Sequence, residues 1–141
     1  MSAVENVKWT KQEIFGRLVY KAQTALDNGA PDTDDYTTEA LALPKGALPT
    51  ILMINHTDTA DGDGVGAADD NGIFLEGSFD KENWAAYKVF DWTQLAENSA
   101  KANTPAASDG DFPYIRVRVN LATAITDAGD PEITPYVVIS P

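Results

Sequence analysis

The sequence contains no cysteine and a single histidine, His56, among its 141 residues. The lack of cysteine excludes a disulfide framework, a thiolate metal site and a cysteine nucleophile, and one histidine excludes any chemistry that needs two. Basic residues are also scarce, since 10 Lys and Arg stand against 22 Asp and Glu, a formal net charge of −12. Because nucleic acid and anionic lipid are both bound by clustered basic residues, we expect neither as a partner.

Long apolar runs are missing as well. The longest is Ile51-Leu52-Met53-Ile54, far too short to cross a bilayer, and the N-terminal stretch has no apolar segment of the kind found in secretory signals. The sequence shows no P-loop, nucleophile elbow or dinucleotide fingerprint, so we expect a protein that is not an enzyme. What remains is an acidic chain with the length of one domain and 43% hydrophobic residues, enough for one core.

Residues 10–27 admit two interpretations. The apolar residues from Phe15 to Leu26 follow the i, i+3, i+4, i+7 spacing of one helical face, and Asn28-Gly29 is a natural helix stop. Equally, apolar residues occupy the even positions from Ile14 onward and alternate with charged ones, as in a strand, while Gly16 lowers helix propensity. The sequence leaves helix and strand open here.

The rest of the chain is typical of β-structure. Short apolar segments at 41–43, 50–55, 73–79, 84–92, 114–121 and 136–139 are separated by stretches rich in Gly, Pro, Asp and Ser. No strand alternates with a long helix, which argues against a parallel α/β sheet. We therefore predict an all-β protein, with an antiparallel, jelly-roll-like β-sandwich over residues 40–141 and an N-terminal arm or connector over residues 1–39 that holds the helix of 10–27 if one forms.

The strand at 114–121 has the clearest pattern, because apolar and polar side chains alternate along it. Its inward positions, together with a tryptophan that follows a turn, are the core residues that we predict: Trp84, Ile115, Val117 and Val119. Its outward positions and a tryptophan of the N-terminal arm are the partner-interface candidates, because Arg, Tyr and Trp are enriched at interface hot spots: Trp9, Tyr114, Arg116 and Arg118. The alternative for the arginines is a solvated sheet face.

A loop at 58–71 alternates Asp with Gly, a pattern that lets a chain wrap oxygen ligands around Ca²⁺. It resembles the calcium repeats of thrombospondin type 3, although Thr59 and Ala67 stand where that family has Asp. The candidate metal ligands are Asp58, Asp61, Asp63 and Asp70. The alternative is a hairpin loop in which Asp and Gly supply turn geometry and no cofactor is bound.

The tryptophans Trp9, Trp84 and Trp92 are also candidates for a sugar-stacking platform. For Trp84 and Trp92 the competing interpretation is core packing.

Two segments resemble a known class of proteins. Glu76-Gly77-Ser78-Phe79-Asp80-Lys81-Glu82-Asn83-Trp84 is similar to an E-G-S-x-D-x-x-N-W hairpin of small β-sandwich proteins from tailed-phage virions. Phe112-Pro113-Tyr114-Ile115-Arg116-Val117-Arg118-Val119 is similar to a later Y-[IV]-R-V strand of the same proteins, and Pro135-Tyr136-Val137-Val138-Ile139 fits their closing strand.

This resemblance implies a structural virion protein, most like a capsid decoration (cement) protein. Such a protein is made in the host cytoplasm, lies on the outer surface of the capsid, and has the major capsid protein and its own subunits, as a homotrimer or homodimer, for partners. The alternative hypothesis is a tail- or fibre-associated binding module for a host glycan or protein, with or without Ca²⁺.

Overall fold

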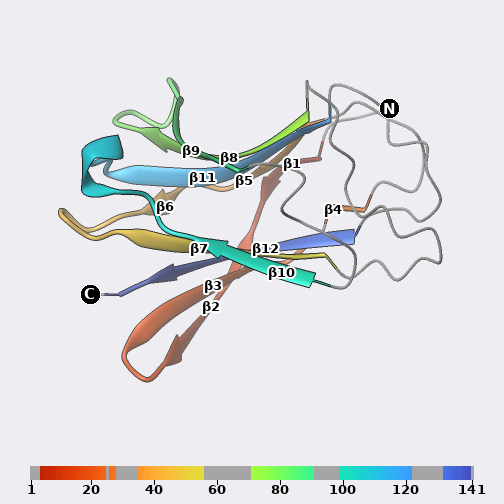
Figure 1. Cartoon of the computed structure of the whole chain (residues 1–141), viewed down its shortest axis with the longest axis horizontal. Helices are drawn as coiled ribbons and strands as arrows, with labels where there is room; N and C mark the ends of the chain where they lie inside the picture. The colour runs from red at the N-terminus through yellow and green to blue at the C-terminus, as the bar shows by residue number, and fades with distance from the viewer. Residues whose placement is uncertain are drawn as a thin grey trace.

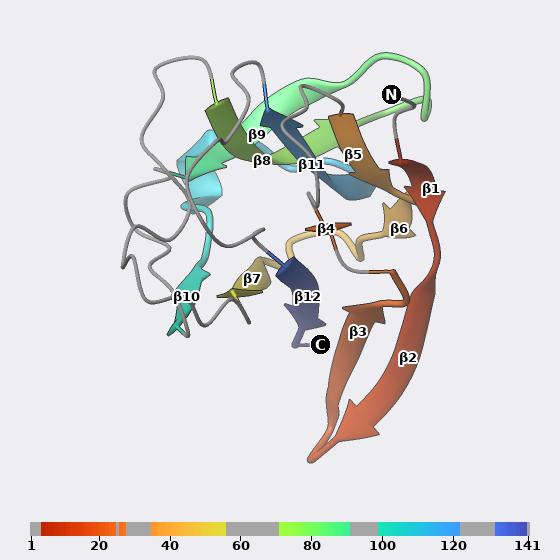
Figure 2. The same ribbon diagram turned by 90° about the vertical axis from the view of Figure 1, so that its right-hand side faces the viewer.

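The computed structural model describes residues 4–24, 26–27, 35–55, 71–90, 99–121 and 132–140. These residues form a β-sandwich of two facing sheets (Figures 1 and 2). This confirms the predicted fold class. The strands and a short 3-10 helix, η2, are β1 (Val4–Val7), β2 (Trp9–Ile14), β3 (Arg17–Ala22), β4 (Leu26–Asp27), β5 (Asp35–Thr38), β6 (Leu41–Ala42), β7 (Pro49–Asn55), β8 (Asn71–Ser78), β9 (Ala85–Phe90), β10 (Ser99–Asn103), η2 (Ala107–Asp109), β11 (Tyr114–Leu121) and β12 (Glu132–Ile139).

The two sheets are built mainly from antiparallel pairs. The first has the order β1-β5-β11-β8-β9, with β6 also paired to β11, and the second has the order β10-β7-β12-β3-β2, with β4 also paired to β12. Strand β1 runs parallel to β5, whereas β11 is antiparallel to its neighbours β5 and β8. The strand predicted at 114–121 is β11, and it lies inside the first sheet between β5 and β8.

The core lies between the sheets and is made by the alternation that the sequence shows. The inward residues of β11 and Leu75 of β8 are fully buried, and β7 and β12 of the other sheet bury matching positions. Burial of one such side chain contributes roughly 1.5–3 kcal/mol. The fully buried apolar side chains of these four strands are Ile51, Met53, Leu75, Ile115, Val117, Val119, Val137 and Ile139.

Residues 10–22 form strands β2 and β3 and the turn between them, so the helix interpretation is wrong for this part of the chain. Strands β2 and β3 make a hairpin whose two-residue turn is Phe15-Gly16, and β3 also pairs with β12. The even positions of β3 pack against the core, which explains why the strand alternation holds. The helical spacing is a coincidence, because several apolar residues of the segment fit both the helical and the strand period. Both turn residues also have positive φ, which a helix does not allow.

Strands β5 and β10 were missed because they lie in polar segments. Strand β5 falls within an acidic connector, yet Tyr36 is fully buried and its hydroxyl donates to the Thr24 carbonyl oxygen. Strand β10 falls within a stretch rich in Ala, Ser and Asn and pairs with β7. Pro135 lies inside β12, between the residues that pair with β4 and those that pair with β3. No residue stands opposite it in the register on that side, so its missing N–H is tolerated there.

Candidate functional site

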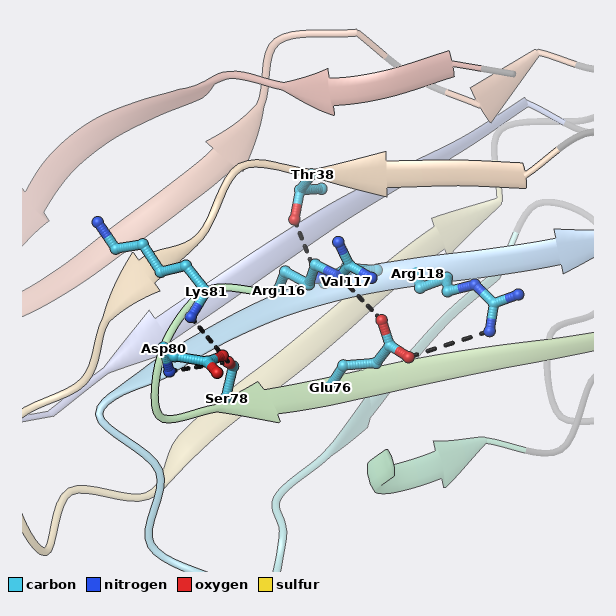
Figure 3. A network of polar contacts seen from close by, with 8 residues as sticks. All are labelled: Thr38, Glu76, Ser78, Asp80, Lys81, Arg116, Val117 and Arg118. Carbon is cyan, nitrogen blue, oxygen red and sulfur yellow. Dashed lines mark hydrogen bonds and ion pairs between the residues drawn. The ribbon is translucent and has the colours of Figure 1, made fainter. Parts of the chain in front are cut away.

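The outer face of the first sheet carries a ladder of charged side chains across β8 and β11. Glu76 stands opposite Arg116 in the strand register, and its Oε1 lies 2.8 Å from Arg116 Nε. Its Oε2 lies 3.9 Å from Arg118 Nη1, so one nearly buried carboxylate bridges two arginines (Figure 3). The alternation that buries Ile115 and Val117 puts these polar residues on the other face.

Aromatic rings flank this ladder at both ends. The Arg116 guanidinium carbon lies 4.3 Å from the ring centroid of Trp84, and that of Arg118 lies 5.6 Å from the centroid of Phe74. These distances allow cation–π attraction. The outer face is therefore a packed sequence of ring, arginine, carboxylate, arginine and ring.

The turn between β8 and β9 is held by side-chain hydrogen bonds. Asp80 Oδ1 accepts from the backbone N–H groups of Glu82 (2.9 Å) and Asn83 (2.8 Å), and Asn83 Nδ2 donates to Asp80 Oδ2 (2.7 Å). Ser78 Oγ donates to Asp80 Oδ1 and accepts from the Lys81 backbone N–H at 2.9 Å. The N–H donors of Asn83 and Glu82 hold the pKa of Asp80 well below its usual range. The network keeps Lys81 in the left-handed region, at φ 64.

A cleft of about 320 Å³ opens beside this turn. Strands β1 and β5 and the segment after β5 form one wall, and the β8–β9 turn with β11 forms the other. Lys81 Nζ lies 4.7 Å from the Tyr114 ring centroid. The residues that line the cleft are Asn6, Thr38, Glu39, Ala40, Lys81, Trp84 and Arg116. The lining thus combines two cations, one carboxylate and an aromatic wall, and the cations can hold an anionic group of a ligand.

The E-G-S-x-D-x-x-N-W segment therefore has a structural explanation for each position. A Cβ at Gly77 would overlap the Phe112 ring and come 2.9 Å from its Cβ. Phe112 in turn contacts Tyr87, with ring centroids 5.2 Å apart. Burial and the nearby carboxylates of Asp111 and Asp109 raise the pKa of Tyr87. The motif builds a hairpin and its contact with β11.

The interface candidates do not form one patch. Tyr114, Arg116 and Arg118 lie together on the outer face of β11, each half-buried. Trp9 lies on β2 in the other sheet, packs on Tyr20 with ring centroids 6.5 Å apart, and donates from Nε1 to the Glu39 carbonyl oxygen at 3.0 Å. Trp9 therefore anchors the N-terminal strands to the sandwich.

Among the predicted core residues, Ile115, Val117 and Val119 are fully buried, but Trp84 differs. It is half-buried and lies on the outer face, where the Arg116 guanidinium covers its ring. The turn before it carries the chain to the outer side of the sheet, so the ring packs on an arginine instead of between the sheets.

The predicted calcium ligands Asp58, Asp61, Asp63 and Asp70 lie outside the described residues, as does Trp92. Within the part of the chain that the structure describes, no group of three or more acidic or histidine side chains could hold a metal ion. In the same residues, no helix is long and apolar enough to cross a membrane.

The β2–β3 hairpin is a candidate contact surface that was not predicted from the sequence. It extends away from the sandwich (Figures 1 and 2), and Phe15 at its tip is 95% exposed. Residues 8–22 carry four of the ten basic residues of the chain and one of its 22 acidic residues, a formal charge of +3, so the remainder of the chain has a formal charge of −15. The signal was present in the Phe-Gly pair between two alternating segments, which predicts a tight turn with an exposed ring.

No protein-family model matches the chain. No curated protein sequence matches it either. Among solved structures, a chain from the capsid of Ralstonia phage GP4 is 13% identical with a TM-score of 0.47, and the match covers 99% of this chain and 88% of that one. A CBM4 structure is 13% identical with a TM-score of 0.46, covering 94% of this chain and 77% of that one.

A third similar structure is the K3 cleaved adhesin domain of Lys-gingipain from Porphyromonas gingivalis, which is 15% identical with a TM-score of 0.42. That match covers 97% of this chain and 87% of the adhesin domain. The neighbours thus include a phage capsid chain and an adhesin domain. At these identities and TM-scores, the neighbours assign no function to this chain.

Proposed function

We propose that this protein is a non-enzymatic structural protein of a tailed-phage virion, which binds the outer surface of the assembled capsid and stabilises it. The observation that carries the proposal is the projecting β2–β3 hairpin with Phe15 exposed at its tip. An element of this shape and chemistry is suited to docking on another protein.

Phe15 is unfavourable for the isolated chain in two ways. Its φ is 48, in the left-handed region that non-glycine residues other than Asn and Asp rarely occupy. Its ring is also almost completely in water, although Asn or Gly would make the same turn without either cost. Burial of the ring in a partner's pocket would contribute roughly 1.5–3 kcal/mol to binding. A contact with another protein therefore explains this residue better than a role within the chain.

The distribution of charge also favours docking through the β2–β3 hairpin. The hairpin is basic while the rest of the chain is strongly acidic. A basic projection suits an acidic patch on a partner, and an acidic body suits the outside of a capsid better than its inner, DNA-facing side. Because the protein would bind the assembled shell and not its separated subunits, it would stabilise the shell by mass action.

The partner is inferred from the two segments that resemble virion β-sandwich proteins. These segments lie far apart in the sequence, and they meet as neighbouring strands β8 and β11 through the contact of Glu76 with Arg116. Within this proposal the partners are the major capsid protein and further copies of this chain, as a homotrimer or homodimer.

The test is binding of purified protein to capsids that lack it, followed by co-sedimentation. Phe15→Asn removes the ring and places a residue that tolerates the left-handed turn, so we expect a fold that is retained and an affinity that falls by about tenfold or more. Phe79→Asn is the matched control, since Phe79 is also an exposed ring, on the other hairpin, at 71% exposure. Equal binding by wild type and Phe15→Asn would contradict the proposal.

A further inference from the structure

We propose that the cleft between the β8–β9 turn and β5 binds one acidic sugar unit, a hydroxylated ring that carries a carboxylate. This inference goes beyond the proposed function, because it concerns a different surface from the β2–β3 hairpin and does not depend on capsid binding.

Two cations line the cleft, although the chain as a whole has a formal net charge of −12. Lys81 has no carboxylate within ion-pair distance among the described residues, and its Nζ lies near the Tyr114 ring. Arg116 contacts Glu76 through Nε, which leaves its two Nη groups to other acceptors. An ammonium and a guanidinium with donors to spare are the groups that hold a carboxylate by charge-assisted hydrogen bonds.

The Lys81 backbone and the Arg116 guanidinium are held in place before any ligand arrives. The Lys81 backbone is fixed in its left-handed conformation by Ser78 and by the Asp80 turn. The Arg116 side chain is fixed between the Glu76 carboxylate and the Trp84 ring. A fixed side chain loses little entropy on binding, so the placement of Arg116 favours affinity.

The remaining lining is suited to a hydroxylated ring. Asn6, Thr38 and Glu39 offer polar groups, and Trp84 adds an apolar wall. The volume of about 320 Å³ is at the lower end of the range of roughly 300–1,000 Å³ for ligand sites, which fits one ring and not a long segment. A cleft that combines cations, hydroxyl partners and an aromatic wall matches the chemistry of a uronic acid.

The experiment is a titration of the full chain with galacturonate, followed by NMR of the Trp84 indole N–H, which is assigned with Trp84→Phe. Galactose carries the same ring without the charge, and acetate carries the charge without the ring. We expect galacturonate to shift the Trp84 signal with millimolar or tighter affinity, and the other two probes to shift it little. The proposal is overturned if galacturonate causes no shift, or if galactose or acetate binds as well as galacturonate does.

Substitutions of the charged residues that line the cleft test whether positive charge there strengthens galacturonate binding. Lys81→Gln should weaken galacturonate binding by about tenfold, while Lys45→Gln, the same change at an exposed site away from the cleft, should leave it unchanged. Glu39→Gln should strengthen binding, because it removes a like charge from the wall and keeps the backbone carbonyl that Trp9 uses. Weaker binding by Glu39→Gln, or unchanged binding by a folded Lys81→Gln protein, would overturn the proposal.

Discussion

The hairpins β2–β3 and β8–β9 both expose a phenylalanine near the turn, and both contain a non-glycine residue with positive φ. In β8–β9, Phe79 contacts Phe112 with ring centroids 5.3 Å apart, and the turn is held by Ser78 and Asp80. In β2–β3, the turn is the two residues Phe15-Gly16, and Phe15 has no ring contact among the described residues.

The two hairpins differ in whether contacts inside the chain explain their unusual residues. Every unusual residue of β8–β9 is explained by a contact inside the chain: a glycine under a ring, a carboxylate that caps a turn, and a lysine that the cap holds in place. At Phe15, no contact within the described part of the molecule compensates for the positive φ or for the exposure of the ring. Residues that cost stability without an intramolecular contact point to a contact with something else.

The largest expected effect is at the glycine that β8 needs for packing. Gly77→Ala would put a methyl group into the Phe112 ring close to its attachment, where rotation gives little relief. We expect a loss of about 2 kcal/mol in the free energy of unfolding, measured by urea denaturation. Phe112→Leu should recover part of that loss in the double variant. A Gly77→Ala protein as stable as wild type would show that this hairpin is not fixed by packing.

Substitution of Gly16 in the turn of β2–β3 should also lower stability, but for a different reason. A Cβ at Gly16 meets nothing within 4 Å, but its φ of 78 strains any residue with a side chain. We therefore expect Gly16→Ala to cost about 1 kcal/mol of unfolding free energy, and Gly16→Asn to cost less because Asn tolerates this conformation. Phe112→Leu should not rescue Gly16→Ala, and a rescue would break the distinction between the hairpins.

The smallest effect concerns the pH dependence of the β8–β9 turn. Because the folded-state pKa of Asp80 lies below the value of about 3.9 for unfolded chains, the carboxylate contributes stability that is fully present above that value. The contribution is lost as the pH falls toward the folded-state pKa. We expect the Tm of wild type to fall more steeply on acidification below about pH 4 than that of Asp80→Asn. Parallel curves for the two proteins would refute the capping role.

The sequence predicted the strands whose pattern is local. Strand β11 alternates apolar and polar residues over its whole length, and its predicted range matches the observed one. The hydrogen bonds of Asp80 to the backbone that follows it are likewise local, and they are typical of Asp in turns. The helix at residues 10–27 was one of two interpretations because Leu18, Ala22 and Leu26 fit both periods, and the pairing of β3 with β2 and β12 decides between them.

The site could not be predicted, because it depends on contacts between distant segments. The Glu76–Arg116 pair joins residues 40 positions apart, and it forms because β8 and β11 pair in one register. Trp84 was predicted for the core since large aromatic residues usually bury there, but its partner Arg116 on the outer face is invisible in the local sequence. The exposure of Phe15 likewise follows from how far β2 and β3 extend beyond their neighbours.

The most direct test of the central claim is cryo-electron microscopy of purified virions assembled in cells that produce this protein, at a resolution that traces the β2–β3 hairpin. The proposal predicts the protein on the outer surface of the capsid, with the Phe15 ring buried in a pocket of a shell subunit and the acidic sandwich facing outward. Absence of the protein from the virion, or a hairpin whose Phe15 points into solvent, would contradict it.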